Sequence, residues 1–197
     1  MVCPDSPANT ISAVFLDRDG VINADSPDYI RHADAFHPIP GSLQAISRLT
    51  RVQVPVIVIT NQSGIGRGLF SMADLDAIHR KLHQMTTACG GTITDIFFCP
   101  HRPDEGCDCR KPLPGLLIQA SLRHRIDLSA AVMIGDSAKD ILAGKAAGCG
   151  RTLLVKTGNG RDALARLSAA GDLPDDVVDD LGAAVTVLLT PGSSNPS

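Results

Sequence analysis

Aromatic residues are scarce in this sequence: they make up 3% of its 197 residues, with no Trp and a single Tyr. Aliphatic side chains must therefore fill the core, which suits a buried parallel sheet rich in Val, Ile and Leu. Long apolar runs are also missing, because no stretch approaches the ~18 consecutive apolar residues of a membrane-spanning helix. We therefore expect that the protein does not associate with a membrane.

Positive charge is not in excess either. The 18 Lys and Arg residues against 21 Asp and Glu residues give a net charge of −3, so nucleic-acid binding has little electrostatic support and is not expected. Residues 1–9 are polar and lack the basic and apolar regions of a secretory signal. These absences predict a cytoplasmic protein, and we expect a monomer that binds a small molecule.

The length is that of one globular domain, with no room for two. We expect a single domain over residues 1–190 and a disordered tail over residues 191–197, which are small and polar.

Short apolar runs alternate with helical patterns along the chain. The apolar runs predict strands at 13–16, 54–60, 93–98, 131–134 and 152–156, followed by a short strand at Val177 and Val178. The helical spacings predict helices at 41–50, 71–88, 114–125 and 161–169. Another predicted helix follows the fourth strand and ends at Ala147, and a last one ends at Leu189. This alternation predicts an α/β fold, a Rossmann-like parallel sheet with helices on both faces. Residues 21–40 form the longest irregular segment, a candidate substrate-binding loop.

An acidic turn, Asp17-Arg18-Asp19-Gly20, follows the first strand. Carboxylates two residues apart repel each other unless a cation lies between them, and a divalent metal there can also hold a phosphate oxygen. The alternative is a solvated Asp-Gly turn.

A second acidic motif, Gly135-Asp136 with Asp140, follows the fourth strand. One helical turn separates the two carboxylates, which therefore share a face and with Asp17 suit Mg²⁺. The alternative is that Asp136 only caps the next helix.

The second strand ends in the polar loop 60–68, TNQSGIGRG. Closely spaced glycines expose backbone N–H groups that can bind a phosphate, and Arg67 adds a cation. No Walker loop occurs in the chain, and a flexible polar loop is the alternative.

Soft metal ligands cluster in the next loop, which contains Cys99, His101, Cys107 and Cys109. Three thiolates and one imidazole match a closed tetrahedral zinc site, which is structural rather than catalytic. The alternative, coincidence, is disfavoured because cysteines are scarce in cytosolic proteins. The basic pair Arg110-Lys111 follows at once, so the zinc loop would hold two cations suited to phosphoryl charge rather than a plain surface pair.

The ordered set DxDG, a strand-terminal Thr, RKP and GDxxxD resembles the haloacid dehalogenase-like phosphatases, over roughly residues 13–157. The fine pattern FLDRDGVIN, VITNQSGIGRG, CPH…CDCRKP and LLVKTGNG is similar to that of the D,D-heptose 1,7-bisphosphate phosphatases. The resemblance implies a haloacid dehalogenase-like fold without a large cap domain and with a zinc-stapled loop.

The same resemblance implies roles for individual residues. Asp17 matches the nucleophile and Asp19 the general acid/base, and Thr60, Arg110 and Lys111 match the groups that stabilise the phosphoryl charge. The implied Mg²⁺ ligands are Asp17, the backbone carbonyl of Asp19, and Asp136; the implied Zn²⁺ ligands are Cys99, His101, Cys107 and Cys109. The positions that align with substrate contacts are Arg18, Asp25, Asp28, Tyr29, Asn61, Gln62, Ser63, Arg67, Arg110 and Lys111.

The implied activity is Mg²⁺-dependent removal of the 7-phosphate from D-glycero-D-manno-heptose 1,7-bisphosphate through an aspartyl-phosphate. The implied pathway is ADP- or GDP-heptose biosynthesis, for lipopolysaccharide core or surface glycan. Two alternatives stay open. One is a histidinol-phosphate phosphatase, whose relatives share the zinc loop, or another small phosphate monoesterase. The other is a non-catalytic zinc-stapled binding module, which would require a broken acidic motif.

Overall fold

The computed structural model describes residues 11–190. The expectations for residues 1–9 and for the tail 191–197 therefore lie outside the described residues. The elements in chain order are β1 (Ala13–Leu16), η1 (Ala33–Ala35), α1 (Ser42–Arg51), β2 (Val56–Asn61), α2 (Ser63–Gly66), α3 (Met72–Ala88), β3 (Asp95–Cys99), α4 (Gly115–His124), η2 (Leu128–Ala130), β4 (Ala131–Gly135), α5 (Ala138–Ala147), β5 (Arg151–Val155), α6 (Gly160–Ala170), β6 (Asp176–Val178) and α7 (Leu181–Leu189).

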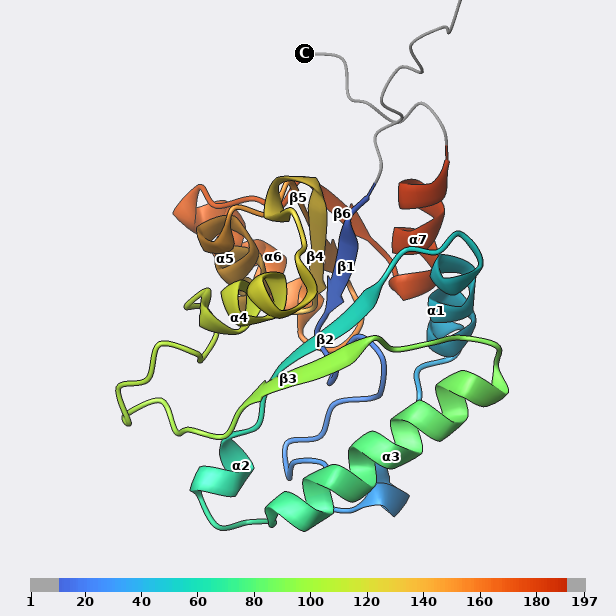
Figure 1. The fold of residues 1–197 in the computed structure, drawn as a ribbon. Coiled ribbons are helices and arrows are strands. Elements are labelled where there is room, and N and C mark those ends of the chain that lie inside the picture. Colours follow the sequence, from blue (N-terminus) through green and yellow to red (C-terminus); the bar gives the residue numbers. More distant parts are fainter. Residues whose placement is uncertain (1–10, 191–197) are drawn as a thin grey trace, which may run out of the picture.

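The six strands form one parallel sheet in the order β3-β2-β1-β4-β5-β6. Helices α1, α3 and α7 cover one face, and α4, α5 and α6 cover the other (Figure 1). The predicted α/β architecture with helices on both faces is confirmed. The chain extends the sheet from β1 towards β3 and then returns to the other side of β1 at β4. Ligands of such sheets bind where the direction reverses, which here is between β1 and β4.

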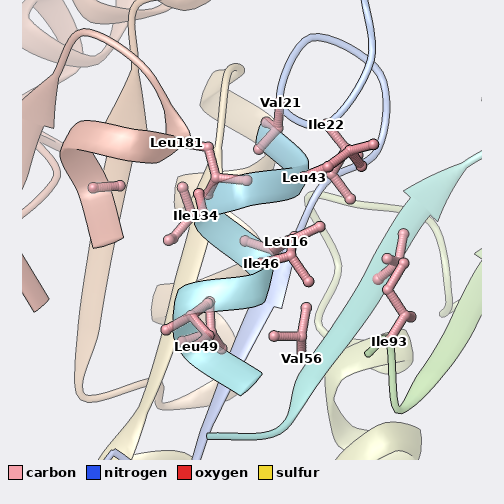
Figure 2. Packing of buried hydrophobic residues seen from close by; sticks show 14 of the residues in the cluster. Leu16, Val21, Ile22, Leu43, Ile46, Leu49, Val56, Ile93, Ile134 and Leu181 are labelled. Carbon is pink, nitrogen blue, oxygen red and sulfur yellow. The ribbon is translucent and has the colours of Figure 1, made fainter. Parts of the chain in front are cut away.

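Side chains alternate between the two faces of the central strands. In β1, Val14 and Leu16 join the cluster beneath α1, whereas Ala13 and Phe15 join the cluster beneath α4. Figure 2 shows Leu16 on the α1 side, packed with the buried side chains of that helix. Because both faces of the sheet are covered, the central strands β1, β2 and β4 are buried almost throughout, whereas the edge strands β3 and β6 are mostly half-buried.

Packing holds α1 in place. The residue before it, Gly41, offers no side-chain cap, but Leu43, Ile46 and Leu49 are all buried against the sheet (Figure 2). Burying each such side chain contributes roughly 1.5–3 kcal/mol, more than the ~1 kcal/mol of a typical cap.

Several predicted boundaries are confirmed. Ser71 and Asp74 form the capping box that opens α3, and this helix ends at Ala88. Gly148 has a positive φ of 83° and ends α5. The start of the second strand differs from the prediction: it was expected at residue 54 and lies at Val56, one residue after Pro55, since proline has no N–H to donate to a sheet.

The long segment between β1 and α1 contains one short helix, η1. Val21, Ile22, Ile30 and Phe36 are buried in the core cluster, so this segment is anchored to the sheet and forms no separate cap domain. Within residues 11–190, no helix combines the length and the apolar character needed to cross a bilayer.

Candidate active site

Three carboxylates meet at the carboxyl ends of β1 and β4, where the order of strand addition reverses. Leu16 of β1 lies opposite Ile134 of β4, and the backbone N–H of Asp17 donates to the carbonyl of Ile134 at 3.0 Å. Asp17 and Asp136 therefore follow neighbouring strands. One oxygen each of Asp17, Asp136 and Asp140 lies within 4.8 Å of the others.

Lys111 reaches into this carboxylate cluster. Its Nζ lies 3.0 Å from Asp17 Oδ1, pairs with Asp140, and donates to the carbonyl of Ile59 at 2.7 Å. The side-chain amide of Asn61 holds the Lys111 backbone, since it donates to the Lys111 carbonyl and accepts from the Lys111 N–H, both at 3.1 Å. Burial lowers the pKa of Lys111, but the neighbouring Asp140 and Asp17 outweigh burial and raise it, so the ammonium stays charged.

The carboxylates are not balanced by this one ammonium. Burial, and then the neighbouring Asp140, raise the pKa of Asp17 well above its ordinary range although Lys111 opposes the shift. Burial and Asp140 also raise the pKa of Asp136 to about 7. A divalent cation bound among these oxygens would relieve the repulsion, and oxygen ligands of this kind suit Mg²⁺.

Asp136 is held by the loop after β5. Its Oδ2 accepts hydrogen bonds from Asn159 N at 2.8 Å and from Asn159 Nδ2 at 3.4 Å. A Cβ at Gly20 or Gly158 would lie 2.1 Å from the same oxygen, so only glycine allows this approach. Both hydrogen bonds use Oδ2, which leaves Oδ1 for a cation.

The alternative role of Asp136 as a helix cap is wrong. Ser137 and Asp140 form the capping box of α5: Asp140 Oδ2 accepts from Ser137 N at 3.0 Å and from Ser137 Oγ at 2.7 Å. Asp140 is thus both a cap partner and a counterion of Lys111, whereas Asp136 is free to serve the site.

Asp19 has very different neighbours. Arg18 donates to it from Nε at 3.1 Å and from Nη2 at 3.0 and 2.8 Å. Asn23 Nδ2 donates at 2.8 Å and Gln62 Nε2 at 2.9 Å. Gln62 Nε2 also contacts Thr60 Oγ1 at 2.9 Å, which links the ends of β1 and β2. The role of Asn23 was not predicted, although Asn23 ends the motif FLDRDGVIN that carries the family resemblance.

The predicted zinc ligands converge on one point. His101 Nδ1 lies 3.5 Å from Cys99 Sγ and 3.4 Å from Cys109 Sγ, and Cys99 Sγ lies 3.6 Å from Cys107 Sγ. Burial raises the pKa of Cys109, whereas hydrogen bonds from the neighbouring thiols outweigh burial at Cys107 and lower its pKa to about 7. Four soft ligand atoms within 4.8 Å fit a tetrahedral zinc ion.

Known proteins resemble this chain over most of its length. D-glycero-beta-D-manno-heptose-1,7-bisphosphate 7-phosphatases from Bordetella bronchiseptica and Pseudomonas aeruginosa are 47% and 46% identical to it over 178 residues, which is 89% and 90% of this chain and 97% and 98% of theirs. A crystal structure of the B. bronchiseptica D,D-heptose 1,7-bisphosphate phosphatase, in complex with magnesium and phosphate, superimposes with a TM-score of 0.84 at 47% identity; it covers 90% of this chain and 98% of that one. A family model of HAD-hydrolase-like proteins matches residues 108–184.

The chain belongs to the D,D-heptose 1,7-bisphosphate phosphatase family of haloacid dehalogenase-like hydrolases. The fold, the enzyme class and the Mg²⁺ expected from the motifs agree with this family.

Two hollows lie near the carboxylate cluster of this chain. One, of about 560 Å³, is lined by Asp25 and Ser26 of the β1–α1 segment and by Thr157 and Asn159 of the loop after β5. Asn159 Nδ2 bridges this hollow to the cluster by donating to Asp25 Oδ2 at 3.2 Å. The other, of about 290 Å³, is lined by Arg110, Lys111 and Lys139, among others.

The remaining substrate positions implied by the family lie at varied depths. The Arg18 side chain is fully buried, and Ser63 is buried at the start of α2. Arg67 is exposed just after α2. Asp28 bonds within its own loop, through Ser26 Oγ at 3.2 Å, and the neighbouring Tyr29 has a φ of 64°.

Proposed function

We propose that this chain is a Mg²⁺-dependent phosphatase that removes the 7-phosphate from D-glycero-D-manno-heptose 1,7-bisphosphate. The observation that carries the proposal is the meeting of Asp17, Asp136 and Lys111 at the switch point of the sheet, in a chain that is 47% identical to a named heptose bisphosphate 7-phosphatase. The printed names of the relatives specify the β anomer, which we propose for this chain too.

Asp17 is the proposed nucleophile. Its carboxylate oxygen forms a bond to phosphorus while the bond from phosphorus to the sugar oxygen breaks, and Asp19 gives its proton to the departing oxygen. In the second step a water oxygen bonds to the same phosphorus, the bond to Asp17 breaks, and the water proton passes to Asp19. Thr60, Arg110 and Lys111 stabilise the phosphoryl oxygens.

Mg²⁺ would be held by Asp17, Asp136 and the backbone carbonyl of Asp19. When bound, it neutralises charge on the phosphoryl oxygens. The raised pKa values of Asp17 and Asp136 support this site, because burial and the neighbouring Asp140 both disfavour the charged carboxylates, and a bound cation would offset both effects. Zinc is proposed to staple the loop that carries Arg110, whose Nη1 donates to the His101 carbonyl at 3.1 Å.

The second phosphate of the substrate is proposed to bind near Arg67 and the glycine-rich turn that includes α2. We propose that the reaction takes place in the cytoplasm, where the thiols of Cys99, Cys107 and Cys109 would stay reduced. A monomer suffices, because all the proposed groups belong to one chain.

A substrate panel with released phosphate as the readout tests the proposal. The heptose 1,7-bisphosphate should give the highest kcat/KM, release one phosphate per molecule, and keep its 1-phosphate. Histidinol phosphate is the decisive competitor: a higher kcat/KM for it would replace the heptose proposal. No turnover of any phosphate ester would refute the phosphatase activity itself.

A further inference from the structure

Arg18 lies between the two key aspartates in sequence, but its side chain is directed into the protein. Its guanidinium is completely buried, so no part of the side chain is exposed to a substrate. A buried cation needs a partner, and the salt bridge to Asp19 at 2.8 Å provides one.

The carboxylate of Asp19 is surrounded by N–H donors. Arg18 and Asn23 both donate to Oδ1, and Arg18 and Gln62 both donate to Oδ2. The planar guanidinium matches a carboxylate through two N–H groups at once, which fixes the orientation of both partners. The Asp19 side chain is still 20% exposed, so one edge remains open towards a substrate.

The other end of Arg18 contacts α3. Nη1 lies 3.5 Å from His79 Nε2, and because a guanidinium has no acceptor, Nε2 must be the unprotonated nitrogen of the ring. Burial and the nearby Arg18 lower the pKa of His79 to about 3, in agreement with a neutral ring. The ring also packs against Phe98 of β3, with centroids 5.9 Å apart at 60°.

We propose that Arg18 is a positioning residue, held by His79, that fixes the carboxylate of Asp19 for proton transfer and does not contact the substrate. This inference rests on the proposed function, in which Asp19 is the general acid/base. It links α3, which contributes no catalytic group, to the proton-transfer step.

The two proton transfers differ in their dependence on the leaving group. A sugar oxygen must receive a proton from Asp19 as its bond to phosphorus breaks. The oxygen of p-nitrophenyl phosphate departs as a stable anion without one. Asp19 is therefore ionised from the start when the aryl ester turns over, and ionised after the first step when the sugar phosphate does. In the second step, for both substrates, a water oxygen bonds to phosphorus, the bond to Asp17 breaks, and the water proton goes to the ionised Asp19. A misplaced Asp19 therefore slows both steps for a sugar phosphate but only the second step for the aryl ester.

Two variants test the inference. Arg18→Lys loses the planar pair of N–H groups that binds Asp19. His79→Leu loses the ring nitrogen that accepts from Arg18 but leaves Arg18 in place. Rapid-mixing measurements with p-nitrophenyl phosphate should show a burst of about one nitrophenol per enzyme, followed by a steady-state rate at least about tenfold lower than in wild type. With the heptose bisphosphate, kcat should fall by a similar factor or more, without a burst and with little change in KM. His79→Gln, which can still accept from Arg18, should restore most of the rate.

His83→Leu is the matched control, because His83 is exposed one turn further along α3, and this variant should behave as wild type. Equal loss of burst and steady state, or a rise in KM for the bisphosphate alone in Arg18→Lys, would overturn the inference and favour a structural or substrate-binding role. If Arg18→Lys does not fold, the His79 pair decides: equal rates in His79→Leu and wild type would also overturn it. Failure of the proposed function is distinguishable, because wild type would then hydrolyse neither ester.

Discussion

Asp17 and Asp19 lie two residues apart and have opposite surroundings. Asp17 is near two other carboxylates and a single ammonium, whereas the neighbours of Asp19 are N–H donors from Arg18, Asn23 and Gln62. Carboxylates in such different surroundings commonly divide nucleophilic and acid/base work between them.

Replacing Asp17 with Asn should abolish turnover and preserve the fold. An amide cannot attack phosphorus, whereas Lys111 keeps Asp140 as a partner, so the buried ammonium is not left unpaired. Phosphate release and circular dichroism on the purified variant check both halves of this expectation. Asp179→Asn, at an exposed residue, should keep full activity; a few per cent of wild-type turnover in Asp17→Asn would remove Asp17 as the nucleophile.

His79 should make the protein less stable in acid. Its pKa is lowered from 6.5 to about 3 in the folded chain by burial and Arg18, so between these values the unfolded chain binds more protons and stability rises with pH. The stability contribution is complete above pH 6.5 and is lost as the pH falls towards 3. At pH 5, which is 1.5 pH units below the unfolded pKa of 6.5, the free energy of unfolding should be lower by about 2 kcal/mol, since each pH unit corresponds to ~1.4 kcal/mol.

Urea unfolding of wild type and His79→Gln at pH 7.5 and pH 5 measures this. The free energy of unfolding should fall less in the variant than in wild type, by up to about 2 kcal/mol. Other groups titrate in both proteins and cancel in the difference. The same fall in both proteins would show that His79 is not held neutral by the fold.

At the scale of elements, the segment between β3 and α4 carries predicted zinc ligands together with the basic pair Arg110-Lys111. Three of the four predicted zinc ligands lie in this segment and the fourth, Cys99, is the last residue of β3. The basic pair begins directly after Cys109. Lys111 is fixed from the other side by Asn61 at the end of β2. The zinc loop and the β2 terminus thus position the same cation.

Cys107→Ser should lower zinc content from one per chain to near zero, because a hydroxyl is a poor replacement for a thiolate ligand. Melting temperature and kcat should fall together, since Arg110 is tied to the His101 carbonyl within the loop. Elemental analysis and thermal unfolding check this. Cys89→Ser, at a free thiol on the opposite face of the sheet, should keep its zinc; unchanged metal in Cys107→Ser would contradict the ligand set.

The turn that contains α2 is the proposed site of the second phosphate. Gly66 N donates to the Pro100 carbonyl at 3.1 Å, so the turn rests on the zinc loop, and Arg67 is exposed beside it. Arg67→Ala should lower kcat/KM for the bisphosphate by about tenfold or more, the effect of losing ~1.4 kcal/mol of binding. An aryl phosphate should be affected little.

Arg161→Ala, at an exposed position on α6, is the control for this measurement. Equal losses for both substrates in Arg67→Ala would mean that Arg67 does not bind a second phosphate. The histidinol-phosphate alternative would then gain support.

At the scale of the whole molecule, the carboxylate cluster destabilises the metal-free fold. Saturating Mg²⁺ should therefore raise the melting temperature. At a Mg²⁺ concentration one hundred times the Kd, the free energy of unfolding should rise by about 2.7 kcal/mol. Each kcal/mol corresponds to roughly 2–4 °C in melting temperature for a chain of this length. In Mg²⁺-free buffer without a chelator, which leaves the zinc in place, Asp136→Asn should melt no lower than wild type, because one repelling charge is gone and Asn159 N can still donate to the amide oxygen.

Differential scanning calorimetry with and without Mg²⁺ checks this expectation. Asp136→Asn should lose the Mg²⁺-dependent gain, and Asp179→Asn should keep it. A full Mg²⁺ response in Asp136→Asn would exclude Asp136 as a ligand.

Local patterns were enough to predict much of this protein. Short apolar runs and helical spacing depend on neighbours in the chain, so the main strand and helix positions, the capping box at Ser71 and the parallel architecture followed from them, whereas the short helices η1, α2 and η2 did not. The zinc ligands lie within one short loop and could be recognised together for the same reason. Each acidic motif could be placed at a strand end, because a charged residue cannot continue a buried strand.

Only the tertiary structure decided which of these groups meet and in which direction each side chain points. Asp17 and Asp136 are adjacent because β4 pairs with β1 and not with β3, an order that no local spacing encodes. The capping role that was the alternative for Asp136 belongs to Ser137 and Asp140, and the Arg18 side chain points inwards to Asp19. Side-chain direction depends on which charges and cavities surround a residue after folding, and those neighbours come from distant parts of the chain.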